Sequence, residues 1–444
     1  MSVRLGRTFC RPTQLVAQIE HLCYTRAMLI QKAFKYRIYP NQAQKAALAV
    51  QFGHARFVYN FGLAACKAHY FEYGRGLNYN DTAYMLTVIK RFVPWLKEAD
   101  SQVLQQSLKD LDRAYANYFE QARKGTLSQP QPDQSRRPLG GKLRKDGMPL
   151  GYPRFKSKDD EQSIRYPQRF EISGSRIKLP KVGAIRAVFH RPIEGEMKSC
   201  TVLRTKTGQY FISIQCELEI EDPVQKPGMV GIDLGLKQFA VLSSGEQIDH
   251  PQYLRKAERR LKRLQRSLSR TQKGSKGREK ARLRLARQHQ KVANQRQDFL
   301  HQASHRIVSE FGTIKIENLN VCGMIKNHHL AKSIADSGWS RFGAFLNYKG
   351  KWTGSQVERV DRFFPSSKTC SVCGWINQEL QLHHRFWVCL GCGTEHDRDK
   401  NASVNLERYV PAERRERIPQ GYTPAGITPV DNPKGWLKPE AQTL

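Results

Sequence analysis

The spacing of apolar and polar residues changes several times along the chain. Apolar and polar residues alternate from Lys32 to Tyr39, which predicts a strand. A helical period follows over about 42–125. Short apolar runs separated by turn residues fill 152–220 and predict a small β-barrel. The first strand could join this barrel, and the helical segment would then be an insertion.

A second arrangement begins after the break at Pro227-Gly228. Three strands between 229 and 250 come first, followed by helices at 254–270 and 277–308 around the turn TQKGSKG. The later predictions are a strand at 312–317, a loop and helix at 327–352, and a strand at 356–361. A meander of strands followed by helices is the order expected of an RNase H-like fold. The whole chain is therefore predicted to be a multidomain α+β protein.

Charge narrows the classes of partner. The 444 residues, enough for two or three domains, carry 74 Lys and Arg against 40 Asp and Glu, a formal net charge of +34. Such an excess indicates a polyanionic partner, which is either nucleic acid or a membrane surface. No apolar run is long enough to span a bilayer, so we expect nucleic acid and no membrane.

The two helices at 254–308 concentrate basic residues. A leucine seam runs along them, basic residues cover the remaining surface, and acidic residues are few. A solvated charged face is the alternative, but such faces usually mix both signs, so phosphate contact is favoured. The candidate nucleic-acid contacts are Arg255, Lys256, Arg259, Lys262, Arg263, Arg266, Arg270 and Arg282.

Four cysteines form two CxxC pairs separated by fifteen residues: Cys370 with Cys373, and Cys389 with Cys392. Two such pairs facing each other give a tetrahedral set of four thiolates, which predicts a structural Zn²⁺ ion. Two disulfides or four unrelated thiols are the alternatives. The six other cysteines show no framework pattern, which indicates a reducing, intracellular compartment.

Three acidic residues are candidates for chemistry. Asp233 and Glu317 interrupt apolar strands, and Asp399 opens a predicted helix. Singly, each has an ordinary explanation: a structural network for Asp233, a strand-end surface position for Glu317 and a helix cap for Asp399. Together they predict a site for Mg²⁺ or Mn²⁺ that hydrolyses phosphodiesters, because such sites gather carboxylates from several elements.

Several motifs between Met28 and Leu406 occur together in one known family. The most specific is the combination of the two CxxC pairs with HDRDKNA, and the others are KAFKYRIYPN, ARFVYN, GYPRF, GIDLGLKQFAV, QDFLH and IENL. With these motifs the chain resembles TnpB, the transposon-associated relatives of the type V CRISPR effector nucleases. The resemblance implies an RNA-guided, metal-dependent endonuclease. Such an enzyme cuts double-stranded DNA that matches a transposon-derived guide RNA beside a short target-adjacent motif.

The resemblance also assigns roles to residues. The implied RuvC metal-binding acids are Asp233, Glu317 and Asp399. Asp397 is the competing choice for the third acid, and Tyr79 and Gln105 match places where family members touch target-adjacent DNA. The alternatives are a nuclease-independent RNA-guided repressor, which the intact acids disfavour, and a DNA strand-transfer transposase, which would use the same metal chemistry.

A domain order follows from the same resemblance. The predicted segments are an N-terminal extension (1–27), a first wedge-barrel strand (28–41), a helical recognition domain (42–125), a flexible loop (126–150), the wedge β-barrel (151–222), a RuvC nuclease domain (228–365) with its basic hairpin (254–308), an inserted zinc ribbon (366–395), a last RuvC helix (396–411) and a disordered tail (412–444). We expect the family's usual start at Met28. We also expect a monomer that carries its guide RNA in the prokaryotic cytoplasm and associates with the nucleoid when it is bound to DNA.

Overall fold

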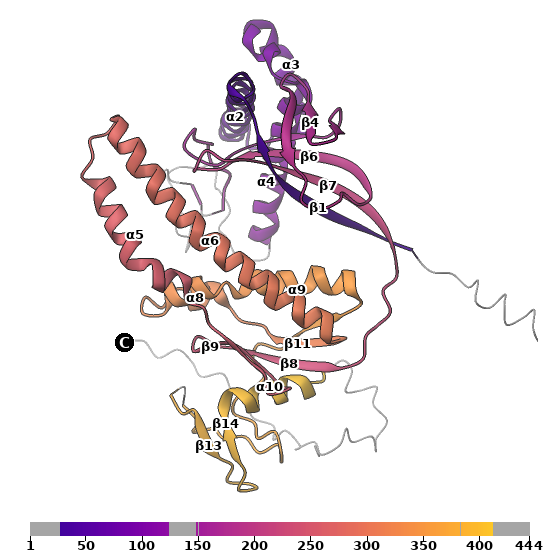
Figure 1. Cartoon of the computed structure of the whole chain (residues 1–444), viewed down its shortest axis with the longest axis vertical. Helices are drawn as coiled ribbons and strands as arrows, with labels where there is room; N and C mark the ends of the chain where they lie inside the picture. The colour runs from indigo at the N-terminus through magenta and orange to yellow at the C-terminus, as the bar shows by residue number, and fades with distance from the viewer. Residues whose placement is uncertain (1–26, 124–147, 150, 382, 412–444) are drawn as a thin grey trace, which may run out of the picture. The chain divides into compact units, whose positions relative to one another are not determined.

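The computed structural model describes residues 27–123, 148–149, 151–381 and 383–411. The predicted N-terminal extension, most of the predicted flexible loop and the predicted tail lie outside them. The chain divides into two compact units, Ala27–Ile220 and Glu221 onward, here called the N-terminal and C-terminal units (Figure 1). None of the described helices is both long and apolar enough to cross a membrane.

A seven-stranded sheet forms the core of the N-terminal unit, in the order β2-β6-β7-β1-β5-β4-β3. Its strands are β1 (Ala27–Tyr39), β2 (Gln162–Tyr166), β3 (Glu171–Ser173), β4 (Arg176–Leu179), β5 (Gly183–Val188), β6 (Glu196–Arg204) and β7 (Tyr210–Glu221). Residues from strands at both ends of this order pack into one core, so the sheet curls. β1 lies between β7 and β5, which confirms that the first strand joins the later ones.

Helices occupy the chain between β1 and β2. They are α2 (Gln42–Tyr73), α3 (Tyr79–Phe92), the 3₁₀ helix η1 (Pro94–Glu98) and α4 (Ser101–Arg123). α2 begins with a reciprocal capping box between Asn41 and Gln44 and ends at Gly74, whose φ of 69° suits glycine. The helical prediction for this segment is therefore confirmed.

A five-stranded mixed sheet organises the C-terminal unit, in the order β10-β9-β8-β11-β12. Its strands are β8 (Met229–Leu234), β9 (Gln238–Leu242), β10 (Gln247–Asp249), β11 (Thr313–Glu317) and β12 (Gln356–Val360). β8, β9 and β10 form an antiparallel meander, while β11 runs parallel to both β8 and β12.

Different helices cover the two faces of this sheet, as Figure 1 shows. Val230 and Ile232 of β8 pack with α6 (Lys276–Glu310) and α9 (Trp339–Thr353) in one apolar core. Side chains alternate along a strand, so Gly231 and Asp233 face the other side. There α10 (Arg398–Arg408) packs so closely that backbone atoms of the helix leave no room for a side chain at Gly231.

A buried lysine holds the end of α10. Lys315 of β11 is paired with Gly231 in the parallel register and therefore points to the same face. Its ammonium group donates hydrogen bonds to the carbonyl oxygens of Glu407 and Tyr409, each over 2.7 Å. A cation at this point also complements the negative end of the helix dipole.

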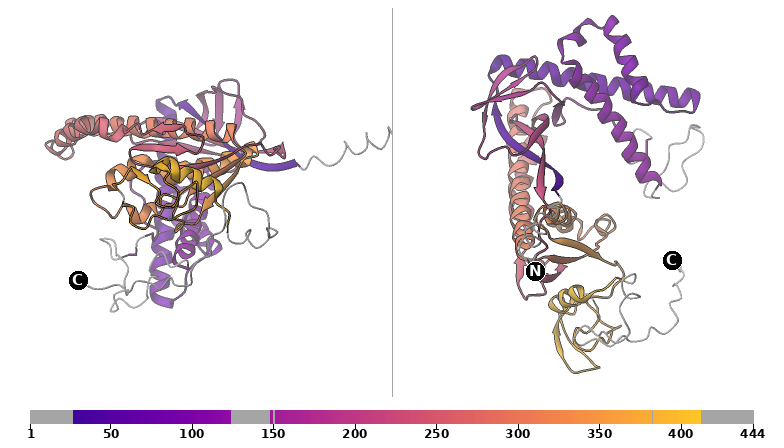
Figure 2. Two further views of the ribbon diagram at one scale, coloured as in Figure 1. Left: turned by 90° about the horizontal axis from the view of Figure 1, so that it is seen from below. Right: turned by 90° about the vertical axis from the view of Figure 1, so that its right-hand side faces the viewer.

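Helices α5 (Tyr253–Ser269) and α6 form a hairpin, seen lengthwise in the left view of Figure 2. Gln252 provides no side-chain cap for α5. Instead, the buried carboxylate of Asp336, in α8 (Ala331–Ser337), accepts a hydrogen bond from the backbone N–H of Leu254 over 3.0 Å and forms an ion pair with Arg296 of α6. This network fixes the base of the hairpin.

The prediction of one helix after the loop at 327 is wrong. A short helix, α7 (Val321–Met324), precedes this segment, and the helical part itself is split into α8 and α9 at Gly338. Gly338 adopts the left-handed conformation, with φ of 70°. This geometry ends one helix and starts the next.

The cysteine segment forms a small module with its own two-stranded antiparallel sheet. The strands are β13 (Phe386–Val388) and β14 (Glu395–Asp397). β14 leads directly into α10, so this helix lies beside β13 and β14 in Figures 1 and 2.

Candidate functional site

Two acidic side chains lie next to each other on β8 and β11. The parallel register that pairs Ile316 with Ile232 makes Glu317 and Asp233 the next pair along the strands. Both side chains therefore face α10. Their carboxyl groups are close enough for one to hydrogen-bond to the other when it carries a proton, and the hydroxyl group of Ser366 donates to Glu317 Oε1 over 3.4 Å.

The electrostatic environment favours protonation of this pair in the absence of a cation. Burial is the largest cause that raises the pKa of Asp233 well above its usual range, and the neighbouring charge of Glu317 adds to it. Burial also raises the pKa of Glu317. Two adjacent carboxylates in a partly buried site repel each other when both are charged, so such a pair binds a divalent cation or retains a proton.

The third predicted acid, Asp399, stands in the first turn of α10 and does not cap it. Asp397 is the cap: its carboxylate accepts hydrogen bonds from the backbone N–H groups of Asp399 and Lys400, each over 3.0 Å. The ordinary explanation of Asp399 as a helix cap is therefore wrong. The carboxylate of Asp397, the competing choice for the third acid, is hydrogen-bonded to the backbone of α10.

Asp399 belongs to the same electrostatic environment as the pair on the strands. Its charge contributes to the raised pKa of Asp233. Its carboxylate also forms an ion pair with Arg385, whose Nη1 lies 3.1 and 3.0 Å from its two oxygens. Among the described His, Cys, Asp and Glu side chains, only the four cysteines bring three or more ligand atoms within 4.8 Å of one another. The carboxylate oxygens of the three acids do not all lie within this distance of one another.

The four cysteines are arranged as a metal site requires. Cys373 Sγ lies 3.5 Å from Cys389 Sγ, and Cys370 Sγ lies 3.7 Å from Cys392 Sγ. A tetrahedral ion with Zn–S bonds of about 2.3 Å would separate its sulfur ligands by roughly this distance. All four are free thiols, which contradicts the alternative of two disulfides. The donor set therefore fits a structural Zn²⁺ ion.

His396 supports one of these cysteines and was not among the sequence candidates. It is buried on β14, and its Nε2 lies 3.0 Å from Cys370 Sγ. Its ring also packs against Trp387, with centroids 4.8 Å apart. A ring nitrogen at this distance orients a thiolate ligand. The sequence signal was the His of HDRD, at the position just before the helix cap.

Replacing one of the four cysteines is expected to abolish metal binding at this site and to destabilise the small module around it. The apolar cluster of the module is small and includes Cys370 and Cys389, so a bound Zn²⁺ ion would supply much of the module's stability. Cys370→Ser or Cys389→Ser should lower the zinc content from about one ion per chain and speed proteolysis around 366–397. Elemental mass spectrometry and limited proteolysis measure both effects. Cys322→Ser, an exposed cysteine outside the set, is the control, and full zinc content in Cys370→Ser would contradict the assignment.

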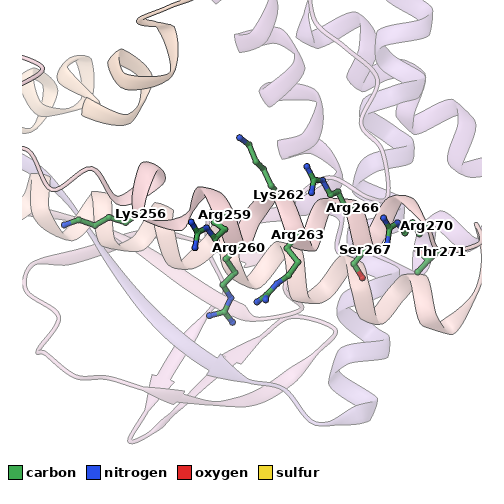
Figure 3. Close-up of a pocket in the computed structure, with 9 residues that line it drawn as sticks. All are labelled: Lys256, Arg259, Arg260, Lys262, Arg263, Arg266, Ser267, Arg270 and Thr271. Carbon is green, nitrogen blue, oxygen red and sulfur yellow. The ribbon is translucent and has the colours of Figure 1, made fainter.

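A basic groove of about 1090 Å³ runs along α5. Figure 3 shows its side chains, all from α5 and the turn that follows it. The residues that line it are Lys256, Arg259, Arg260, Lys262, Arg263, Arg266, Ser267, Arg270 and Thr271. Six of the eight predicted basic contacts are therefore gathered in one groove, while Arg255 and Arg282 do not line it.

One acidic residue on α5 modifies this picture. Glu258 forms ion pairs with Lys262 and with Lys332, each at 2.9 Å. Its hydrogen bond from Lys332, followed by that from Lys262, lowers the pKa of Glu258 to about 2. The charge of Lys262 is thus partly neutralised, whereas Arg263 beside it forms no ion pair with any of the described residues.

Tyr79 and Gln105 lie in the N-terminal unit. Tyr79 begins α3 and is partly buried in the core of the helices. Lys109 of α4 lies 5.3 Å from the centre of its ring, and Gln105 is exposed one turn before Lys109 on the same helix. The two predicted DNA contacts therefore come from neighbouring helices.

Family models match three parts of the chain. A model described as OrfB_IS605, "Probable transposase", matches residues 213–328. A model of the Cas12f1-like TNB domain matches 339–406, and the helix-turn-helix model HTH_OrfB_IS605 matches 28–75.

Two similar proteins cover most of the chain. A protein of Streptomyces pristinaespiralis named "Putative RNA-guided DNA endonuclease" is 36% identical over 384 residues, which is 85% of this chain and 89% of the relative. Escherichia coli InsQ, with the same description, is 32% identical over 84% of this chain and 91% of its own length. A cryo-EM structure of a Cas12f1–sgRNA–target DNA complex matches with a TM-score of 0.32 and 16% identity, covering 85% of this chain and 99% of that one. By its sequence, the chain belongs to the TnpB family of transposon-encoded proteins.

Proposed function

We propose that the chain is a divalent-metal-dependent, RNA-guided DNA endonuclease. It would cut DNA complementary to a transposon-derived guide RNA, beside a short target-adjacent motif. The observation that carries the proposal is the placement of Asp233 and Glu317 side by side on β8 and β11, with Asp399 on the helix that covers them. The presence of all three acids disfavours a repressor that does not cut DNA.

The strand order supports an RNase H-like, RuvC-type nuclease fold for the C-terminal unit. A meander carries the first acid, and helices follow before β11 returns parallel to β8 with the second acid. In the N-terminal unit, the curled sheet would be the wedge barrel and α2–α4 the recognition domain. The module around β13 and β14 would be a zinc ribbon inserted before the third acid.

The acids of the site would hold Mg²⁺ or Mn²⁺. Two such ions, when bound, supply an activated water and stabilise the leaving oxygen of the phosphodiester. Asp233 and Glu317 would hold the cation from the strands, with both carboxyl groups deprotonated. Asp399, which is paired with Arg385 in this structure, would hold it from α10. Ser366 keeps the carboxylate of Glu317 oriented by its hydrogen bond.

The groove on α5 would bind the sugar-phosphate backbone of guide RNA or DNA. Its guanidinium groups repeat about every turn of the helix, a rise of about 5.4 Å that is close to the phosphate spacing of one strand. Contacts of this kind give affinity without sequence preference.

The salt dependence of binding tests the groove. Replacing Arg259, Arg263 and Arg266 together with Gln should weaken nucleic-acid binding uniformly across sequences and flatten the slope of log K against log salt by about 2 to 3. Fluorescence anisotropy at several salt concentrations measures the slope. Lys262→Gln should change it less than Arg263→Gln, because Glu258 already neutralises Lys262. A slope unaffected by the triple replacement would place the nucleic acid elsewhere.

Guided cleavage tests the function as a whole. The protein is purified with its co-expressed RNA and mixed with Mg²⁺ and a supercoiled plasmid that carries a guide match. We expect a linear product, and none with a mismatched plasmid or with EDTA. Absence of a copurified small RNA, or cleavage that ignores the guide match, would overturn the proposal.

A further inference from the structure

The loop between β12 and the first cysteine pair connects the acid site to the cysteine site. Ser366, near its start, donates a hydrogen bond to Glu317 Oε1. Four residues later Cys370 contributes the first sulfur of the four-cysteine set. We call residues 365–371 the linking loop. Its conformation determines how far the second acid lies from the cysteine module.

Two buried asparagines of α10 bind this linking loop. The Nδ2 of Asn405 donates to the carbonyl oxygens of Ser366 and Thr369, over 2.8 and 2.6 Å. The Nδ2 of Asn401 donates to the same Thr369 oxygen over 2.7 Å, and its Oδ1 accepts from the backbone N–H of Ser371 over 2.9 Å. Asn401 and Asn405 are only 3% and 4% exposed.

The position of the two asparagines on α10 connects the linking loop to Asp399. Asn401 and Asn405 are four residues apart and share one face of α10, two and six residues after Asp399. Asparagine suits this place because it offers both donors and an acceptor to the backbone. Asp would set a carboxylate against carbonyl oxygens, and Leu would leave those buried carbonyl groups without partners.

We infer that Asn401 and Asn405 are positioning residues for the metal site. They fasten the linking loop, which carries Ser366 and Cys370, to the helix that carries Asp399. Together with the contacts of α10 at Gly231 and Lys315, the loop then fixes the spacing between Asp399 and Glu317. The four-cysteine set orders the loop from its other end. Zinc in the cysteine site thereby raises the affinity of the acid site for Mg²⁺, although the zinc ion takes no part in the reaction.

The inference rests on the proposed assignment of the three acids as metal ligands, and its test separates the two ideas. The purified ribonucleoprotein is titrated with Mg²⁺, and two curves are recorded: the shift of the melting temperature and the rate of cleavage of a matched plasmid. The variants are Asn405→Leu and the milder Asn405→Ser, with zinc content and DNA binding measured for each.

Asn60→Leu is the matched control. Asn60, in the N-terminal unit, also makes two side-chain hydrogen bonds to backbone: it donates one to Lys156 over 3.0 Å and accepts one from Lys156 over 2.8 Å. Its loss should therefore cost similar hydrogen bonds without touching the acids. The control should leave the Mg²⁺ titration curves at the positions seen for the parent protein.

We expect Asn405→Leu to raise the half-saturating Mg²⁺ concentration about tenfold or more in both curves, with zinc content and DNA binding near parent values. Asn405→Ser should show a smaller shift, and high Mg²⁺ should restore much of the rate. Unchanged Mg²⁺ curves in both variants would overturn the inference, as would an equal shift in Asn60→Leu. If Asn405→Leu fails to fold, Asn405→Ser decides. Failure of the parent to cut while its melting temperature still responds to Mg²⁺ would count against the guided nuclease alone.

Discussion

Asp233→Asn is expected to abolish DNA cleavage while making the metal-free protein more stable. The loss of rate should be on the order of 10³-fold or more, because one of the three carboxylates proposed to hold the metal is removed. The gain in stability follows from removing a partly buried carboxylate that repels Glu317. For a domain of this size, each kcal/mol gained should raise the melting temperature by about 2–4 °C.

The sign of the pH dependence follows from the raised pKa of Asp233. The folded protein keeps a proton that the unfolded chain releases near pH 4, so the stability of the parent protein falls as pH rises from about 4 toward the folded-state pKa. The Asp233→Asn variant has no titrating group at this position, so its stability does not fall in this way as the pH rises. The difference in melting temperature between variant and parent, measured in EDTA, should therefore widen with rising pH.

Calorimetry in EDTA and in Mg²⁺, together with plasmid cleavage, decides the outcome. Mg²⁺ should stabilise the parent protein more than the variant. Asp249→Asn, which alters an exposed acid on the same sheet, is the control and should behave as the parent. A variant that cuts normally, or that melts lower than the parent in EDTA at neutral pH, would refute the assignment of Asp233.

Gly231→Ala is expected to destabilise the C-terminal unit strongly and to disturb the acid site. The added Cβ would lie 2.0 Å from the carbonyl oxygen of Ser403 and 2.4 Å from the backbone nitrogen of Glu407. Backbone atoms cannot rotate away as a side chain would, so α10 must move off β8. We expect a loss on the order of 3 kcal/mol or more of unfolding free energy and loss of cleavage, since Asp399 moves with the helix.

Urea denaturation measures this change in stability. Gly277→Ala provides the control, because its new Cβ meets nothing closer than 3.7 Å at the start of α6 and alanine favours a helix. The control should be neutral or slightly stabilised. If Gly231→Ala were as stable as the control, α10 could not be packed directly against β8.

Elements defined by local patterns were predictable from the sequence. The helices expected at 254–270 and 277–308 are observed at Tyr253–Ser269 and Lys276–Glu310. Their leucine seam, the turn between them and the cap at Ser275 are all local signals. The cluster of four cysteines was equally predictable, because the spacing of the two CxxC pairs is a property of the sequence alone.

Features that depend on distant partners could not be predicted. The break at Gly338 was missed because apolar spacing continues across it, and the conformation of Gly338 depends on packing. Asp336, Asn401 and Asn405 are polar residues whose partners lie 30 to 82 residues away. Nothing in the local pattern distinguishes such residues from surface ones. The assignment of Asp233, Glu317 and Asp399 came from their unusual placement and from the family resemblance together.

The hydrogen bonds of Lys315 to the end of α10 limit how far the protein can be shortened from its C-terminal side. A chain that stopped after Arg408 would lose Tyr409, whose carbonyl oxygen accepts one of the two hydrogen bonds described above for the buried ammonium group of Lys315. Such a loss leaves a charge poorly solvated and weakens the anchor of the helix that carries Asp399. A chain that stopped after Pro411 would keep both acceptors. A version of this protein shortened at its C-terminal side should therefore extend at least through Tyr409.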